Sequence, residues 1–98
     1  MRSSLFVSLV ITCLFSSTIQ AQKSKKELKG DKYFSVFYFE KAIEKYKKAP
    51  TLSLEGKRKL ADSYKNLGNY QQAETLYETV VANADANPDD YYNYAYLL

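Results

Sequence analysis

The residue types that most often carry catalysis or bind metals are scarce in this chain of 98 residues. It contains no histidine, which excludes imidazole acid–base chemistry and the commonest metal ligand. Its single cysteine, Cys13, lies in an apolar N-terminal stretch, and its three glycines form no phosphate-binding loop. The sequence therefore offers no nucleophile paired with a base and no histidine or cysteine metal cluster.

Two pairs of neighbouring carboxylates remain as candidates for acid–base or metal chemistry. Glu40 and Glu44 are one helical turn apart, but lysines are interspersed with them, which is typical of a solvated helix face. Asp89 and Asp90 stand in the first turn of an expected helix, where the helix dipole favours negative charge. We therefore predict no catalytic, cofactor-binding or metal-binding residue, and no enzymatic activity.

Charge is distributed unevenly along the chain. The formal net charge of +3 is too small to indicate nucleic acid binding by itself, and we expect no nucleic acid partner. From Lys23 to Lys59 basic residues outnumber acidic ones by twelve to five. From Leu60 to Leu98 only Lys65 opposes six carboxylates. The chain thus has a basic N-terminal part and an acidic C-terminal part.

Residues 1–21 have the features of a secretory signal peptide. A charged start, Met1-Arg2, precedes the apolar run Leu5–Phe15, and small or polar residues lead to Ala21. The apolar run is about half of the roughly 20 residues that span a bilayer, so a retained transmembrane helix is the weaker interpretation. We expect cleavage after Ala21 and export to the periplasm or outer membrane.

Cys13 keeps a second interpretation of this leader open. In bacterial lipoproteins a cysteine after the apolar core is lipidated and becomes the first residue of the mature chain. Thr12 suits the position before such a cysteine poorly, and the apolar run continues past it. If Cys13 is removed with the leader, the mature chain has no cysteine and needs no disulfide.

A lysine-rich segment, from Gln22 to Ser35, follows the leader. Its lysines are Lys23, Lys25, Lys26, Lys29 and Lys32. The first interpretation is a solvated helix face. The second is contact of Lys23, Lys25, Lys26 and Lys29 with anionic lipid headgroups or an envelope polymer, worth about 1 kcal/mol per lysine near an anionic membrane.

The clearest helical pattern runs from Leu60 to Val81 and predicts two antiparallel helices. Apolar residues recur at the spacing of one helix face on both arms. They are Leu60, Ala61, Tyr64 and Leu67 on the first arm, and Tyr70, Ala73, Leu76, Tyr77, Val80 and Val81 on the second. Gly68 supplies the positive φ that ends the first helix, and Asn69 with Gln72 predicts a capping box for the second.

Further helices are expected on both sides of this hairpin. Residues 36–49 carry an apolar stripe, and Thr51 or Ser53 can cap a helix that runs to Leu67. Asn87, followed by a proline and two carboxylates, predicts another helix start. The chain is therefore expected to be all-α.

Ten tyrosines could suggest stacking on bases or sugars. Most of them fall at positions where helices pack, so we expect the following to lie in the core: Tyr33, Tyr46, Tyr64, Tyr70 and Tyr77.

The spacing of small and aromatic residues resembles the tetratricopeptide repeat. The signature in the hairpin is Ala61, Tyr64, Gly68, Tyr70, Ala73 and Tyr77. A later copy, about 34 residues downstream, comprises Tyr94, Ala95 and Leu98. An earlier copy lies upstream at a spacing shorter by three residues, and comprises Gly30, Tyr33, Ala42 and Tyr46. Phe37 takes the upstream place of the turn glycine. We expect about two and a fraction repeats over residues 22–98, either as the N-terminal fragment of a longer chain or completed by another chain.

The resemblance implies a binding function. In tetratricopeptide repeats the first helix of each hairpin lines a concave groove that receives a protein or peptide segment. The aligned groove positions are Glu27, Asp31, Phe34, Arg58, Asp62, Lys65, Asn66, Tyr92 and Tyr96. Repeats that hold a C-terminal carboxylate use lysine, arginine and asparagine, and the two aspartates depart from that set. The other interpretation is that each of these is an ordinary solvated residue.

The order of leader, lysine-rich start and repeats also resembles the N-terminal repeats of envelope proteins from the Bacteroidetes. In that family, exported repeats precede a β-propeller and an OmpA-like peptidoglycan-binding domain, and some members serve type IX secretion or gliding. The resemblance implies an exported protein–protein interaction scaffold of the bacterial cell envelope. The alternative is a membrane-associated lipoprotein or basic lipid-binding module, attached through Cys13 or the lysine-rich head.

Overall fold

A computed structural model describes residues 23–98, which form five α-helices and no β-strand. The helices are α2 (Lys25–Ser35), α3 (Phe39–Lys48), α4 (Leu54–Asn66), α5 (Tyr70–Val81) and α6 (Pro88–Leu97). The expected signal peptide and Cys13 lie outside the described residues. Within the described residues the all-α prediction is confirmed, and none of these helices is both long and apolar enough to cross a membrane.

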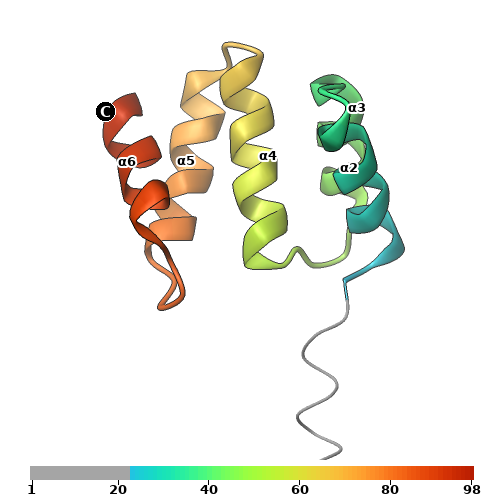
Figure 1. Cartoon of the computed structure of the whole chain (residues 1–98), viewed down its shortest axis with the longest axis horizontal. Coiled ribbons are helices and arrows are strands. Elements are labelled where there is room, and N and C mark those ends of the chain that lie inside the picture. Colours follow the sequence, from blue (N-terminus) through green and yellow to red (C-terminus); the bar gives the residue numbers. More distant parts are fainter. Residues whose placement is uncertain (1–22) are drawn as a thin grey trace, which may run out of the picture.

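The helices form an open stack (Figure 1). α2 and α3 make one antiparallel hairpin, α4 and α5 make a second, and α6 packs on α5. Both hairpin turns and the end of α6 lie at the same edge of the stack, the upper edge in Figure 1. The α3–α4 and α5–α6 connections lie at the opposite edge.

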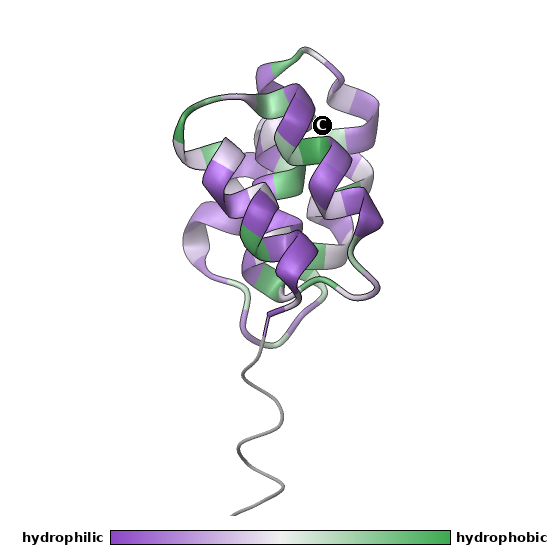
Figure 2. Cartoon of the chain, turned by 90° about the vertical axis from the view of Figure 1, so that its right-hand side faces the viewer, coloured by the Kyte–Doolittle hydropathy of each residue, from purple (hydrophilic) through white to green (hydrophobic). Residues whose placement is uncertain are grey.

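Two adjoining apolar clusters fill the stack. One is built around Ala42, Tyr46 and Leu60, and the other around Ala61, Ala73 and Tyr77. The alanines at the centre of each hairpin are fully buried, which lets the helices approach closely. Figure 2 shows hydrophobic and hydrophilic segments alternating along the helices, as expected of amphipathic helices with one buried face.

The ends of the helices follow local chemistry. Ser53 caps α4 by accepting a hydrogen bond from the Gly56 N–H at 3.1 Å. Asn87 and Asp90 form a reciprocal capping box at the start of α6. Gly68 has a φ of 81°, so the prediction for the α4–α5 turn is confirmed.

Three local predictions are wrong. Asn69 precedes α5 but its side chain makes no capping hydrogen bond, because its backbone (φ −83°, ψ 68°) is not in the extended conformation of an N-cap. The helix expected over residues 36–49 begins only at Phe39, because residues 36–38 form the hairpin turn. Tyr70 is 56% exposed, because the first residue of α5 stands beside the turn and past the end of α4.

The other four tyrosines expected in the core lie in or against it. Tyr46 and Tyr77 are each 1% exposed. Tyr33 and Tyr64 are half-buried and pack on the apolar clusters.

The α2–α3 turn repeats the backbone conformation of the α4–α5 turn with a different residue. Phe37 has a φ of 61° at the place where the second hairpin has Gly68. The left-handed conformation costs a residue with a side chain about 1–2 kcal/mol, whereas glycine adopts it freely. The two hairpins therefore follow the same path although only one has the favourable turn residue.

Candidate protein-binding face

The residues expected to line a groove all stand on α2, α4 and α6. Polar contacts connect α4 to each of the other two helices, so the three can be described as one face, the α2–α4–α6 face. Its residues differ in how many hydrogen bonds and ion pairs their side chains already make within the chain.

Glu27 is a structural residue at the contact of α2 with the start of α4. Its side chain is 1% exposed and its carboxylate accepts hydrogen bonds from the Ser53 N–H, at 2.8 Å, and from the Ser53 hydroxyl. A Cβ added at Gly56 would lie 2.8 Å from this carboxylate. The close fit leaves Glu27 no room to reach a ligand.

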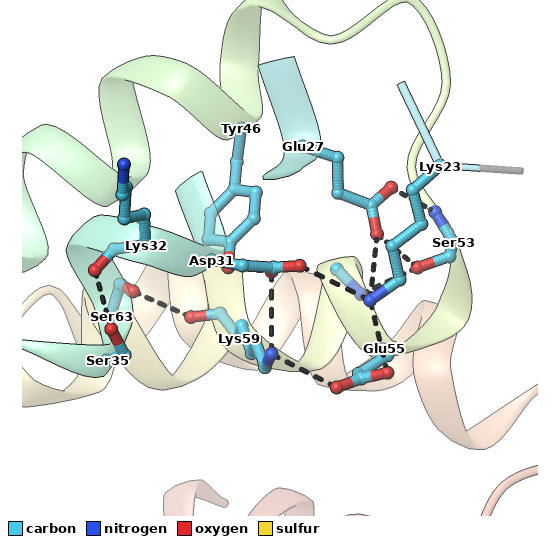
Figure 3. Close-up of polar contacts among 11 residues, drawn as sticks. Lys23, Glu27, Asp31, Lys32, Ser35, Tyr46, Ser53, Glu55, Lys59 and Ser63 are labelled. Carbon is cyan, nitrogen blue, oxygen red and sulfur yellow. Dashed lines mark hydrogen bonds and ion pairs between the residues drawn. The ribbon is translucent and has the colours of Figure 1, made fainter. Parts of the chain in front are cut away.

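Two lysines and two carboxylates alternate in a charge network beside it (Figure 3). Lys23 Nζ lies 3.3 Å from a carboxylate oxygen of Asp31 and 3.3 Å from one of Glu55. Lys59 Nζ lies 3.5 Å from Asp31 and 3.0 Å from Glu55. The four charges compensate one another and join α2 to α4.

The network holds its carboxylates in the ionised form. Burial alone raises the pKa of Asp31, but hydrogen bonds from Tyr46 (2.6 Å) and Lys23 and the charge of Lys59 outweigh it, so the pKa lies below its ordinary value. Hydrogen bonds from Lys59 and Lys23 lower the pKa of Glu55. Asp31, a predicted groove residue, is therefore engaged with three side chains of its own chain.

Asp62 is the counterpart of Asp31 in the second hairpin. It accepts a hydrogen bond from the Tyr77 hydroxyl, at the same separation of 15 residues as the bond from Tyr46 to Asp31. No ion pair to Asp62 is present among the described residues, and burial raises its pKa. The same tyrosine–aspartate bond thus recurs with different charge compensation.

Arg58 fixes α6 against α4. Its Nε lies 2.7 and 2.9 Å from the two carboxylate oxygens of Asp90, and its Nη2 donates to the Asp85 carbonyl at 3.3 Å. Asp90 is 2% exposed, and although burial raises its pKa, the hydrogen bonds from Arg58 and from the Asn87 backbone outweigh this and lower it. The positive charge of Arg58 is therefore largely neutralised by Asp90.

Phe34 is packed rather than free. Its ring lies 5.8 Å from that of Phe39 in an edge-on arrangement, and Lys59 Nζ lies 5.8 Å from its centroid. It is half-buried against the first apolar cluster.

The remaining predicted residues form an open end of the face, which comprises Lys65, Asn66, Tyr92 and Tyr96. Lys65 Nζ donates to Asn93 Oδ1 at 3.2 Å and lies 5.8 Å from the centre of the Tyr96 ring. Tyr92 and Tyr96 are 69% and 70% exposed. The exposed Asn66 side chain donates to the Asp62 carbonyl at 2.7 Å and keeps its own oxygen available.

A shallow cavity adjoins the open end. Its volume is about 300 Å³, and it is lined by Tyr70, Tyr96 and Leu97. The first turn of α5 and the last turn of α6 therefore form one aromatic hollow beside Lys65.

Several residues of the face are not among its predicted positions: Lys23, Glu55, Lys59, Asp90 and Asn93. Glu55 and Lys59 stand four apart, which could have marked them as an ion pair next to the predicted stripe. The partners from other helices carried no such local signal.

The lysines of the N-terminal head divide into two groups. Lys23, expected to contact an anionic surface, forms ion pairs with Asp31 and Glu55. Lys25, Lys26 and Lys29 make no ion pair within residues 23–98.

Comparisons of the chain with protein-family models, with curated proteins and with solved structures find no match. In residues 23–98, no group of three or more histidine, cysteine or carboxylate side chains could hold a metal ion.

Proposed function

We propose that this chain is an exported protein–protein interaction scaffold built of tetratricopeptide-type hairpins, whose α2–α4–α6 face binds a protein or peptide segment. The matching turns and the recurring tyrosine–aspartate bond support the repeat assignment. The face combines three helices that come from three successive units, which is the arrangement of a solenoid groove.

One observation carries the proposal. Tyr92 and Tyr96 are about 70% exposed on the same face as Lys65, where the other charges are largely compensated within the chain. Tyrosine presents a rigid aromatic surface with a polar end, and it is enriched where proteins bind one another. The rings would pack on apolar side chains of a bound segment, while Lys65 and Asn66 bind its carbonyl or carboxylate oxygens.

A photo-crosslinking amino acid in place of Tyr96, in the intact protein in its native cells, tests this function. We expect one discrete adduct, and none from the matched position Thr79, which is exposed on α5. Similar adducts from both positions, or no adduct from either, would refute the proposed face.

The cellular setting belongs to the same proposal. The leader and the lysine-rich start support an envelope protein, and the family resemblance suggests the repeat segment of an OmpA-like, peptidoglycan-anchored protein linked to type IX secretion or gliding. Intact-mass analysis of cell fractions should find a mature chain that begins at Gln22 in the periplasm or outer membrane. A full-length chain in the cytoplasm would contradict export.

A second candidate function is contact with an anionic surface, through the lysine-rich head or a lipid on Cys13. The observation that favours it is the row Lys25, Lys29 and Lys32 along α2, exposed and without an ion pair in residues 23–98. Salt-sensitive binding to anionic vesicles would support the lysine row, and an acyl mass on Cys13 would support lipidation.

A further inference from the structure

Exposed apolar side chains gather at one edge of the stack. We name this the turn edge: Val36, Phe37, Tyr38, Leu67, Tyr70, Tyr96 and Leu98. They come from the two hairpin turns and from the ends of α5 and α6 beside them, which Figure 1 shows at the upper edge. Within the described residues, the connections at the opposite edge contribute no large exposed apolar side chain.

Phe37 is the residue that folding explains least. Its side chain is 78% exposed, its φ is 61°, and the centre of its ring lies 6.2 Å from that of Phe39. Gly68 makes the same turn in the second hairpin without strain. A bulky apolar residue in a strained and exposed position is expected where a contact outside the chain uses it.

Positive charge stands directly behind the apolar turns. α2 and α4 each have a lysine in the last turn, Lys32 and Lys65, immediately before the two hairpin turns. The acidic residues Asp85 and Asp89 belong to the α5–α6 connection and the start of α6, at the opposite edge. The turn edge therefore presents apolar and aromatic groups with Lys32 and Lys65 behind them and the single carboxylate of Glu40 in the first turn of α3, while Asp85 and Asp89 lie at the opposite edge.

This chemistry suits an anionic lipid surface. Tyrosine rings favour the boundary between headgroups and acyl chains, and lysines are attracted to anionic headgroups. Tyr70 and Tyr96 line the aromatic hollow at one end of the edge, whereas Phe37 and its neighbours project from the other turn. A fluid bilayer can admit such separate side chains without a matching pocket.

We propose that the turn edge enters the headgroup region of an anionic bilayer, with Phe37 inserted furthest. The inference rests on the second candidate function and names the surface that meets the lipid. The groove residues other than Lys65 and Tyr96 take no part in it.

Tryptophan reporters in the full chain test the insertion locally, because the protein contains no tryptophan of its own. Phe37→Trp places an indole on the turn edge. Tyr91→Trp is the matched control, since Tyr91 is 53% exposed in the first turn of α6, at the other end of that helix from Tyr96 and on a different helix from the lysine row. Each variant is mixed with vesicles of brominated phosphatidylglycerol and phosphatidylcholine, or of brominated phosphatidylcholine alone.

We expect the indole of Phe37→Trp to shift its emission to the blue and to be quenched by the anionic vesicles, while that of Tyr91→Trp changes little. Phe37→Gly suits the backbone of the turn and should weaken the salt-sensitive binding to vesicles by about tenfold, against less than about twofold for Tyr91→Ser.

The other outcomes overturn the inference in distinguishable ways. Salt-sensitive binding without quenching of Phe37→Trp would refute insertion of the turn edge and leave the lysine row as the contact. Absence of binding would refute both. Equal quenching by neutral vesicles would refute the requirement for anionic lipid. A change of Phe37→Trp emission only with the partner crosslinked at position 96 would make the edge a protein interface.

Discussion

At the scale of single residues, Asp31 and Asp62 occupy equivalent positions in the two hairpins but differ in the charges around them. Both accept a hydrogen bond from a buried tyrosine of the following helix. Asp31 also pairs with Lys23 and Lys59, whereas no lysine or arginine pairs with Asp62 in residues 23–98. Burial raises the pKa of Asp62. At Asp31 burial acts in the same direction, but the hydrogen bonds from Tyr46 and Lys23 and the charge of Lys59 outweigh it and lower the pKa.

This difference predicts opposite responses to the same substitution. Asp31→Asn keeps an acceptor for Tyr46 but loses two ion pairs, and should lower the free energy of unfolding by about 0.5–1 kcal/mol. Asp62→Asn keeps an acceptor for Tyr77 and removes a buried charge, so the free energy of unfolding should stay unchanged or rise. Urea unfolding followed by circular dichroism at neutral pH measures both. Equal losses would contradict the account.

The lowered pKa values also predict acid sensitivity. For Asp31, Glu55 and Asp90 the folded state binds protons less readily than the unfolded state. Their stabilisation is complete above the unfolded values near pH 4 and is lost as the pH falls through the lower folded values. Asp62, with a raised pKa, acts in the opposite direction and offsets part of the loss.

The urea concentration at the midpoint of unfolding should therefore decrease as the pH is lowered from roughly 6 to 3. Asp31→Asn should reduce the steepness of that fall, because one of the contributing carboxylates is gone. A midpoint that does not change with pH would contradict the charge network.

At the scale of elements, the sequence predicts the helices and their ends well where the signal is local. Ser53, Gly68 and Asn87 act through their own backbone and the next turn, so spacing and residue type suffice. The cap at Asn69 and the burial of Tyr70 are wrong because both depend on the course of the turn before α5. The spacing of apolar residues shows which face of a helix is buried, but it does not show where the neighbouring helix ends.

The two hairpin turns predict a reversal of the usual preference for alanine over glycine. Phe37→Gly should be more stable than Phe37→Ala by about 1 kcal/mol, because both lose the ring and only alanine keeps the strain. Gly68→Ala should lose about 1 kcal/mol for the same reason, since a Cβ there meets no atom within 4 Å and only φ opposes it. Thermal unfolding measures the three variants. A more stable Phe37→Ala would show that residue 37 leaves the left-handed region in solution.

At the scale of the whole molecule, the stack is linear. Each hairpin packs on the next, and α6 packs on α5 and is fixed to α4 by Arg58. Such an arrangement opens from its ends, because a terminal helix is supported from one side only. The contacts that fix α6 join residues about 30 positions apart, which is why the sequence predicted Arg58 and Asp90 separately but not their bond.

Arg58→Gln should therefore loosen α6 selectively. It leaves the buried Asp90 without its cation, at a cost of about 1–3 kcal/mol, and amide exchange in α6 should accelerate about tenfold or more. Lys57→Gln is the matched control, since Lys57 makes no ion pair in residues 23–98. Acceleration spread equally over α2 and α3 would argue against a linear stack.

The sequence predicts which helices carry the binding face, but not which of its residues remain available. Asp31 and Arg58 are engaged through contacts between helices, whereas Tyr92 and Tyr96 stay exposed because no described element covers that side of α6. Whether a side chain of this face is free to bind a partner thus depends on how the helices pack.

The most direct test of the α2–α4–α6 face is hydrogen–deuterium exchange of the intact protein, alone and bound to the partner captured at position 96. We expect slower exchange in α4 and α6 on binding, with α3 unchanged. Protection confined to α3, or absent from α4 and α6, would contradict the claim that this face binds the partner.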